Sequence, residues 1–103
     1  MNEVSFVGLD PSNALREYAQ SKVATLVDES EPLPSRVVLE ASHHSHHGHR
    51  FRAKFEVVVR GDTVVTGTRG EFTDPYAAID SAYDEAKRAI RERAAKREAR
   101  RKA

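Results

Sequence analysis

Apolar and polar residues alternate in three stretches of the chain, the pattern of strands with one buried face. The alternation is clearest from Phe51 to Val59, where every second residue is apolar. Shorter stretches of this kind lie at residues 4–6 and 37–42, and a run rich in β-branched residues covers 64–69. These segments predict four strands. The last three should form an antiparallel meander, because a polar histidine-rich segment and Gly61-Asp62 suit tight turns.

Two further stretches place apolar residues at spacings of three and four, which predicts amphipathic helices. The first should open at Asp10-Pro11, with Asp as the cap and Pro in the first helical position, and end before the prolines of residues 31–34. The second opens at Asp74-Pro75 with the same two signals. The apolar stripes are Leu15, Tyr18, Ala19, Val23, Leu26 and Val27 in the first helix and Tyr76, Ile79, Tyr83, Ala86 and Ile90 in the second.

The predicted order of elements is β-α-β-β-β-α, an α+β fold. Its simplest arrangement is a two-layer sandwich in which both helices cover one face of a four-stranded sheet. The first two strands should be parallel if they are adjacent, because a helix crosses between them. A length of 103 residues fits one compact domain. We expect this domain over residues 1–92, followed over 93–103 by a basic helical extension or a disordered tail with little to bury.

The formal net charge of +1 conceals a strong asymmetry along the chain. Residues 1–86 carry 8 Lys/Arg against 14 Asp/Glu, a net of −6, whereas residues 87–103 carry 9 against 2, a net of +7. A folded body with a basic arm is typical of proteins that bind a polyanion. A solvated tail without a partner is the simpler alternative.

Several protein classes fit the sequence poorly. The chain has no Cys, no basic and apolar leader at its N-terminus, and no apolar run long enough to span a membrane, which favours a cytoplasmic protein. Carboxylates such as Glu40 and Glu71 have no nucleophile motif, glycine-rich phosphate loop or HExxH helix beside them. We therefore expect no enzymatic activity.

Two motifs connect the chain to a known family. The first is Gly8-Leu9-Asp10-Pro11, which leads into residues 14–18 and Lys22. The second and more specific is Gly70-Glu71 followed by Asp74-Pro75-Tyr76-Ala77-Ala78-Ile79-Asp80. With this order of elements, the chain resembles the ribosome hibernation-promoting factor family, also called ribosome-associated inhibitor A or sigma-54 modulation proteins. It stops before the second domain of the long members and so resembles the short form.

The resemblance implies a fold related to the double-stranded RNA-binding domain and a place in the tRNA and mRNA channel of the small ribosomal subunit. Its implied function is to inhibit translation under stress by occupying that channel and neutralising ribosomal RNA phosphates. No cofactor, membrane or DNA is implied as a partner, and we expect a monomer off the ribosome.

The resemblance also suggests which residues meet RNA. Lys22 and Arg88 match basic positions of the family, and Tyr76 and Asp80 match positions that organise the start of its last helix. The predicted RNA-binding residues are Lys22, Arg69, Tyr76, Asp80, Lys87, Arg88, Arg91 and Lys96. Lys and Arg suit this role because RNA helices are bound mainly through phosphates and 2′-hydroxyls. Thr25, Asp28 and Glu85 stand where the family often has basic residues, which makes the helical patch thinner here.

Five histidines lie within seven residues, at positions 43, 44, 46, 47 and 49. His43, His44, His46, His47 and His49 are weak candidates for a zinc, nickel or copper site, since neutral imidazole is a common ligand. Alternatively, they form a passive polar loop, or they become cationic in acid and add charge toward RNA beside Arg50 and Arg52. Two alternative functions therefore stay open: a general structured-RNA-binding protein and a His-rich metal-binding protein.

Overall fold

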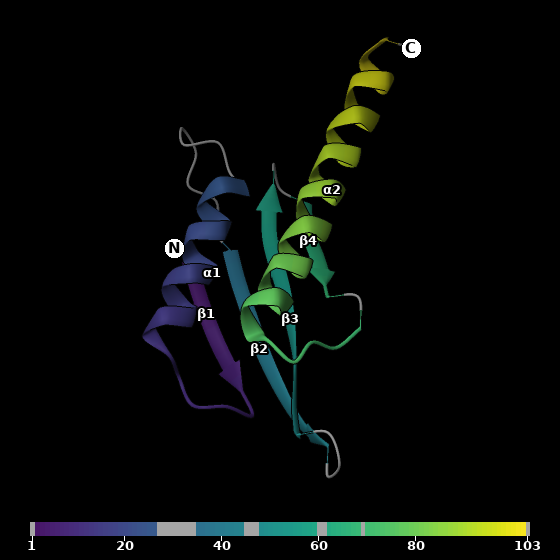
Figure 1. Cartoon of the computed structure of the whole chain (residues 1–103). Helices are drawn as coiled ribbons and strands as arrows, with labels where there is room; N and C mark the ends of the chain where they lie inside the picture. Colours follow the sequence, from purple (N-terminus) through teal and green to yellow (C-terminus); the bar gives the residue numbers. More distant parts are fainter. Residues whose placement is uncertain (1, 27–34, 45–47, 60–61, 69, 103) are drawn as a thin grey trace.

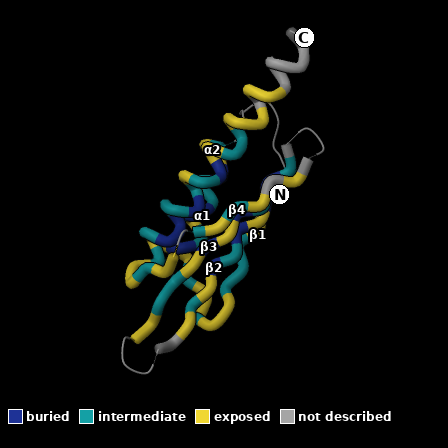
Figure 2. The backbone as a smooth tube through the Cα atoms, turned by 90° about the vertical axis from the view of Figure 1, so that its right-hand side faces the viewer, coloured by how far each residue is buried: buried dark blue, intermediate teal, exposed yellow. Residues whose placement is uncertain are grey.

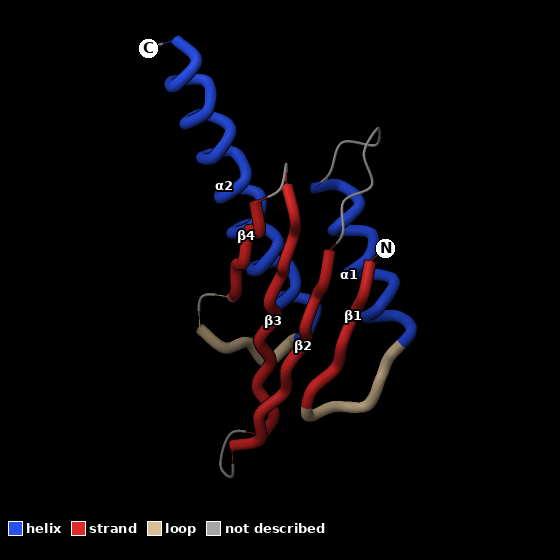
Figure 3. The backbone as a smooth tube through the Cα atoms, turned by 180° about the vertical axis from the view of Figure 1, so that it is seen from behind, coloured by secondary structure: helices blue, strands red, loops and turns tan. Residues whose placement is uncertain are grey.

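The computed structural model of the chain describes residues 2–26, 35–44, 48–59, 62–68 and 70–102. Its elements are β1 (Asn2–Val7), α1 (Asn13–Leu26), β2 (Ser35–His44), β3 (Gly48–Val59), β4 (Asp62–Gly67) and α2 (Pro75–Lys102). The strands lie in the order β1-β2-β3-β4, with β1 parallel to β2 and the other neighbours antiparallel. Both helices cover one face of the sheet (Figure 1). In the view from behind, the other face of the sheet is turned toward the viewer (Figure 3). The predicted α+β two-layer sandwich is confirmed.

The core lies between the sheet and the two helices, as the buried residues of Figure 2 show. The alternation in β2 and β3 turns every second residue toward the helices, and Phe55 at the centre is fully buried. Helix α2 meets this layer mainly with alanines, which lets it pack closely against β3 and β4. The buried apolar residues are Leu15, Ala19, Val23, Val37, Leu39, Ala53, Phe55, Val57, Ala78, Ile79, Ala82 and Ala86.

Helix α2 begins where the sequence predicts. The Asp74 carboxylate accepts a hydrogen bond of 2.9 Å from the Tyr76 N–H, and the Asp74 carbonyl accepts one of 3.1 Å from the Ala78 N–H. Asp74 is therefore the N-cap, with Pro75 in the first helical position. Backbone bonds of 2.7 and 3.0 Å between Phe51 and Phe72 hold the preceding segment against β3. They fix where α2 enters the helix layer.

Helix α1 begins later than predicted. The prediction of Asp10 as cap and Pro11 as first helical residue is wrong, because Ser12 is the N-cap. Its carbonyl accepts a bond of 2.9 Å from the Arg16 N–H, and its Oγ accepts one of 3.3 Å from the Leu15 N–H. The chain needs the preceding residues to cross from the sheet to the helix layer.

That crossing depends on a glycine. Gly8 has a φ of 78°, and a Cβ atom there would stand 2.3 Å from the Ala41 carbonyl oxygen on β2. Only glycine fits this turn without moving the backbone. Leu9 then packs against the core. The turn at Gly8 therefore delivers the chain from β1 toward α1.

Strands β2 and β3 extend into the histidine segment from both sides. Strand β2 runs through His44 and β3 starts at Gly48, and His43 stands directly opposite His49 in the ladder. Only part of the predicted hairpin end, residues 45–47, lies outside the described residues. Val27, the prolines of residues 31–34, Gly61 and Arg69 lie outside them as well.

Helix α2 is much longer than the sheet that it covers. Its 28 residues span about 42 Å at 1.5 Å per residue. Among the described side chains of α2, Ala86 is the last that is buried, and those described from Arg91 onward are exposed. We call residues 91–102 the arm, which projects beyond the sheet (Figures 1 and 2). The predicted boundary between a domain at 1–92 and an extension at 93–103 stays a prediction.

Candidate nucleic-acid interface

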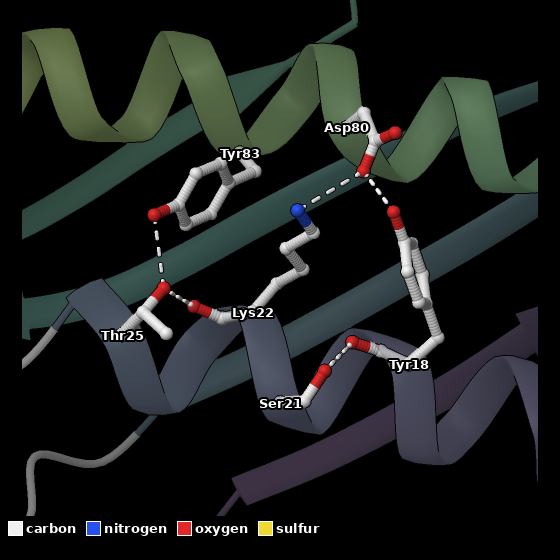
Figure 4. Close-up of polar contacts among 6 residues, drawn as sticks. All are labelled: Tyr18, Ser21, Lys22, Thr25, Asp80 and Tyr83. Carbon is white, nitrogen blue, oxygen red and sulfur yellow. Dashed lines mark hydrogen bonds and ion pairs between the residues drawn. The ribbon is translucent and has the colours of Figure 1, made fainter.

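A polar cluster joins α1 to α2 on the side of the helix layer that faces away from the sheet. We call Tyr18, Lys22, Thr25, Asp80 and Tyr83 the interhelix cluster (Figure 4). Asp80 on α2 is its centre: its carboxylate accepts a hydrogen bond from the Tyr18 hydroxyl and lies 3.5 Å from Lys22 Nζ. One carboxylate thus connects two side chains, one helical turn apart on α1, to α2.

Two aromatic rings flank the Lys22 ammonium group. Its Nζ lies 5.4 Å from the ring centroid of Tyr18 and 4.9 Å from that of Tyr83, both within cation–π range. The Tyr83 hydroxyl in turn lies 2.9 Å from Thr25 Oγ1. The Lys22 side chain keeps 31% of its surface exposed, so its charge is oriented but still reachable from solvent.

The ionisation of the cluster follows from these contacts. The hydrogen bond that Tyr18 donates to Asp80 raises the pKa of its phenol, and burial and the charge of Asp80 add to this effect. Partial burial lowers the pKa of Lys22, but the attraction of Asp80 and Tyr18 outweighs it and raises the pKa overall. At neutral pH the cluster therefore holds a neutral phenol and a cationic Lys22.

Tyr76 is less buried than a core residue would be. Its ring meets that of Tyr18 edge to face, with centroids 5.0 Å apart and planes at 74°. The residue keeps 39% of its surface exposed. Both a packing role and a base-stacking role are compatible with this position, because the ring contacts Tyr18 and remains partly accessible to solvent.

The cations of α2 differ in their surroundings. Arg88 forms an ion pair of 2.6 Å with Glu85, and Lys87 lies 5.9 Å from the ring centroid of Tyr83. Arg91 and Lys96 are exposed on the arm and form no ion pair within the described part of the chain. The arm therefore offers cations that a phosphate can approach without first breaking such a pair.

The structure brings together only part of the predicted RNA-binding set. Lys22 and Asp80 are in contact, Tyr76 joins them through Tyr18, and Lys87 adjoins them through Tyr83. Arg88, Arg91 and Lys96 follow along α2, and Arg69 lies outside the described residues.

Sequence reasoning missed Tyr18, Thr25 and Tyr83 as polar members of the cluster. Tyr18 and Tyr83 were assigned to the apolar stripes by their spacing alone. The available signal was the phenol group itself, since a partly buried tyrosine hydroxyl usually finds a partner. The four-residue spacing of Tyr18 and Lys22 places both on one face of α1, but it does not show that Asp80 lies opposite them.

The metal hypothesis has no support in the part of the chain that the structure describes. Among these residues, no three His, Cys, Asp or Glu side chains are close enough to hold an ion. His49 instead stacks on Phe51, with ring centroids 6.5 Å apart. His46 and His47, and the side chains of His43 and His44, lie outside the described part, so the hypothesis stays open. The search for membrane spans in the same part finds no helix long and apolar enough to cross a bilayer.

Solved structures share this fold. The N-terminal domain of Thermus thermophilus Protein Y is 28% identical, with a TM-score of 0.70 over 89% of this chain and 98% of that domain. A ribosomal subunit interface protein from Coxiella burnetii has a TM-score of 0.73 at 18% identity, over 92% of this chain and 99% of that one. None of the curated protein sequences matches the chain. The family model described as sigma 54 modulation protein / S30EA ribosomal protein matches residues 3–98, so the chain belongs to that family.

Proposed function

We propose that this protein binds the RNA of the small ribosomal subunit, within the channel used by tRNA and mRNA, and blocks translation under stress. Membership of the S30EA ribosomal protein family supports a ribosomal partner. So does the similarity to Protein Y and to a protein named for the ribosomal subunit interface. In this proposal the protein acts in the cytoplasm, is a monomer off the ribosome and uses no cofactor.

The observation that carries the proposal is the charge distribution on α2. Residues 87–103 hold nine basic residues against two acidic ones, and α2 continues as a helix to Lys102, with its described side chains from Arg91 to Lys96 exposed. Such a rod of positive charge fits a polyanion better than an apolar or uncharged partner. RNA phosphates supply the matching charge, and each phosphate that is neutralised releases counterions.

In this mechanism the protein blocks translation by occupying the channel, and no chemical step is required. The protein, including the arm, is 55 Å long in its greatest dimension. By occupying the channel it excludes other molecules from it. The interhelix cluster keeps α1 and α2 in register, so that Lys22 and the cations of α2 are presented from one rigid layer. We accordingly propose no catalytic activity.

Co-sedimentation with isolated small subunits at low and high salt tests the proposal. The wild type should bind at low salt, be released at high salt, and be displaced by tRNA. Arg91→Gln/Lys96→Gln removes two arm cations and should weaken binding on the order of tenfold at about 0.1 M salt, the loss expected for one phosphate contact that contributes about 0.9 to the salt slope.

The matched control removes two cations from the opposite face of the sheet. Arg36 and Arg52 are exposed on β2 and β3, and they alternate with residues buried beneath the helices. Arg36→Gln/Arg52→Gln should bind nearly as the wild type does. Equal weakening by both variants, or equal binding to an unrelated RNA duplex, would favour a general RNA-binding protein. No binding at low salt would refute the ribosomal proposal.

A further inference from the structure

The face of α2 that is buried in the body continues along the arm as a basic face. Ile79, Ala82 and Ala86 are buried against the sheet, at the alternating spacings of three and four that keep residues on one side of a helix. The same spacings lead, past one half-buried turn, to Arg93 and Lys96. Both are exposed, and the arm to which they belong projects beyond the sheet (Figure 1).

Two more basic positions extend this side of the helix. Arg97 follows Arg93 by four residues, and Arg100 follows Lys96 by four. We call Arg93, Lys96, Arg97 and Arg100 the sheet-side stripe. The four arm positions that lie on the same side of α2 as the buried residues of the body are therefore all Arg or Lys.

The acidic residues of α2 are kept off this side. In the helix projection, at 3.6 residues per turn, each acidic position falls at least about 75° from the centre line of the buried positions. These carboxylates are Asp80, Asp84, Glu85, Glu92 and Glu98. The opposite face mixes signs, with Asp84 next to Lys87 and Arg91. Charge is thus sorted around the helix as well as along the chain.

The stripe also has a defined place in the fold. The arm leaves the body beyond the end of the sheet at which β3 ends (Figures 1 and 2). Along the arm, the side of α2 that packs on the sheet in the body therefore extends past that end of the sheet. An extended polyanion passing beneath the arm would meet basic positions about one helical turn apart.

We propose that an RNA backbone passes beneath the arm, across the end of the sheet, with its phosphates bound by the sheet-side stripe. The inference rests on the proposed function and adds to it the side of α2 that RNA occupies. It predicts that Arg93, which the sequence did not single out, contributes more than the outward-facing Arg91. The uniform positive charge of the stripe selects RNA phosphates over a neutral or cationic partner.

Distance makes the two faces of the helix distinguishable. An α-helix with its side chains is about 10–12 Å across. The Debye length at about 0.1 M salt is about 10 Å, so charges on the far face of the arm are largely screened from RNA on the near face. Only cations on the contacted side should therefore release counterions on binding.

The test compares two matched pairs of substitutions in the full chain. Arg93→Gln/Lys96→Gln neutralises the sheet-side stripe, and Lys87→Gln/Arg91→Gln removes the same charge from the outward face of the same helix. Dissociation constants for isolated small subunits are measured over a series of KCl concentrations. At about 0.1 M salt the first pair should weaken binding on the order of 50-fold and lower the salt slope by about 1.8. The second pair should cost about threefold by long-range charge alone.

Each outcome bears on a different statement. Equal losses for the two pairs, or a larger loss for the outward pair, overturn the placement of RNA and leave the proposed function standing. Failure of the wild type to bind small subunits overturns the proposed function itself. Self-association that is lost only in the sheet-side variant, with subunit binding unchanged, would overturn the inference in favour of a second copy of this acidic body. Circular dichroism of both variants checks that α2 keeps its helical content.

Discussion

The helix layer of the body and the arm present positive charge in different ways. In the body, Lys22 faces Asp80 and Arg88 faces Glu85, so these two cations already have carboxylate partners. On the arm, Arg91 and Lys96 form no ion pair among the described residues, and basic residues far outnumber acidic ones. The body is therefore suited to holding a shape, and the arm to attracting a polyanion.

The body and the arm also differ in what stabilises them. Exposed ion pairs contribute little to stability, about 0–1 kcal/mol each, so the body depends on its apolar core. The described side chains of the arm are exposed, so the arm depends on helix propensity and on its continuity with the anchored part of α2. Stability and binding should consequently respond to substitutions in different regions.

The largest expected effect is on stability, from a substitution in the body. Phe55 is fully buried at the centre of the sheet and packs against the helix layer. Phe55→Ala should lower the free energy of unfolding by about 3–5 kcal/mol, because it removes buried surface and leaves a cavity. Urea denaturation measures this loss. Lys96→Ala, in the arm, should change the unfolding free energy by less than about 0.5 kcal/mol.

The next largest effect should be on binding, from substitutions in the arm. We expect replacement of the six cations of residues 93–102 by Gln to weaken small-subunit binding on the order of 10²- to 10³-fold at about 0.1 M salt, if half of them meet phosphates. Sedimentation at several salt concentrations provides the measurement. The urea midpoint should be unchanged, since these residues lie beyond the last buried turn of α2. A large shift of that midpoint would contradict the division of roles.

The fold could be predicted from the sequence because its signals are local and agree with each other. Alternation in β2 and β3 follows from one buried face, and Asp74-Pro75 marks the start of α2 by a contact within one turn. The start of α1 was misjudged because it is set by a contact distant in sequence. The turn at Gly8 is fixed by its close approach to Ala41 on another strand. No local pattern records that approach.

The candidate site was less accessible to sequence reasoning. The charge of the arm could be read directly, because seven cations within the twelve residues 91–102 need no tertiary information. The interhelix cluster depends on how α1 and α2 face each other across 62 residues of sequence, from Tyr18 to Asp80. Family resemblance pointed to Asp80 without showing that it joins Tyr18 and Lys22. Packing between helices supplied that information.

A smaller effect is expected from removing a carboxylate in the body. Asp80 lies beside Lys22, so a phosphate about 3 Å from that ammonium would also stand about 6 Å from the carboxylate. This repulsion amounts to about 0.7 kcal/mol in water. Asp80→Asn keeps an acceptor for Tyr18 but removes the charge, and should strengthen small-subunit binding about threefold.

Tyr18→Phe is the matched comparison for this prediction. It removes the phenol hydrogen bond and leaves the charges of Asp80 and Lys22 in place. Small-subunit binding should then be unchanged or slightly weaker. Weaker binding by Asp80→Asn, measured in the same sedimentation assay, would show instead that the carboxylate helps the body to bind by orienting Lys22.

The smallest effect should appear at alkaline pH, within the interhelix cluster. The pKa of Tyr18 is raised above 10.0, first by the hydrogen bond to Asp80, and that of Lys22 above 10.5. A raised pKa in the folded chain means that each protonated group stabilises the fold below its ordinary pKa. That contribution is lost as pH rises through the folded pKa. Stability of the wild type should therefore fall above about pH 10.

The carboxylate that causes this shift can be tested directly. Titration of the tyrosine rings by NMR should show the pKa of Tyr18 falling toward its ordinary value in Asp80→Asn. Asp84→Asn removes an exposed carboxylate one turn further along α2 and should leave that pKa unchanged. If both variants titrate as the wild type does, Asp80 does not hold Tyr18 in solution. The polar contacts left between the two helices of the body would then be the Lys22–Asp80 ion pair and the Thr25–Tyr83 hydrogen bond, beside the apolar packing of the core.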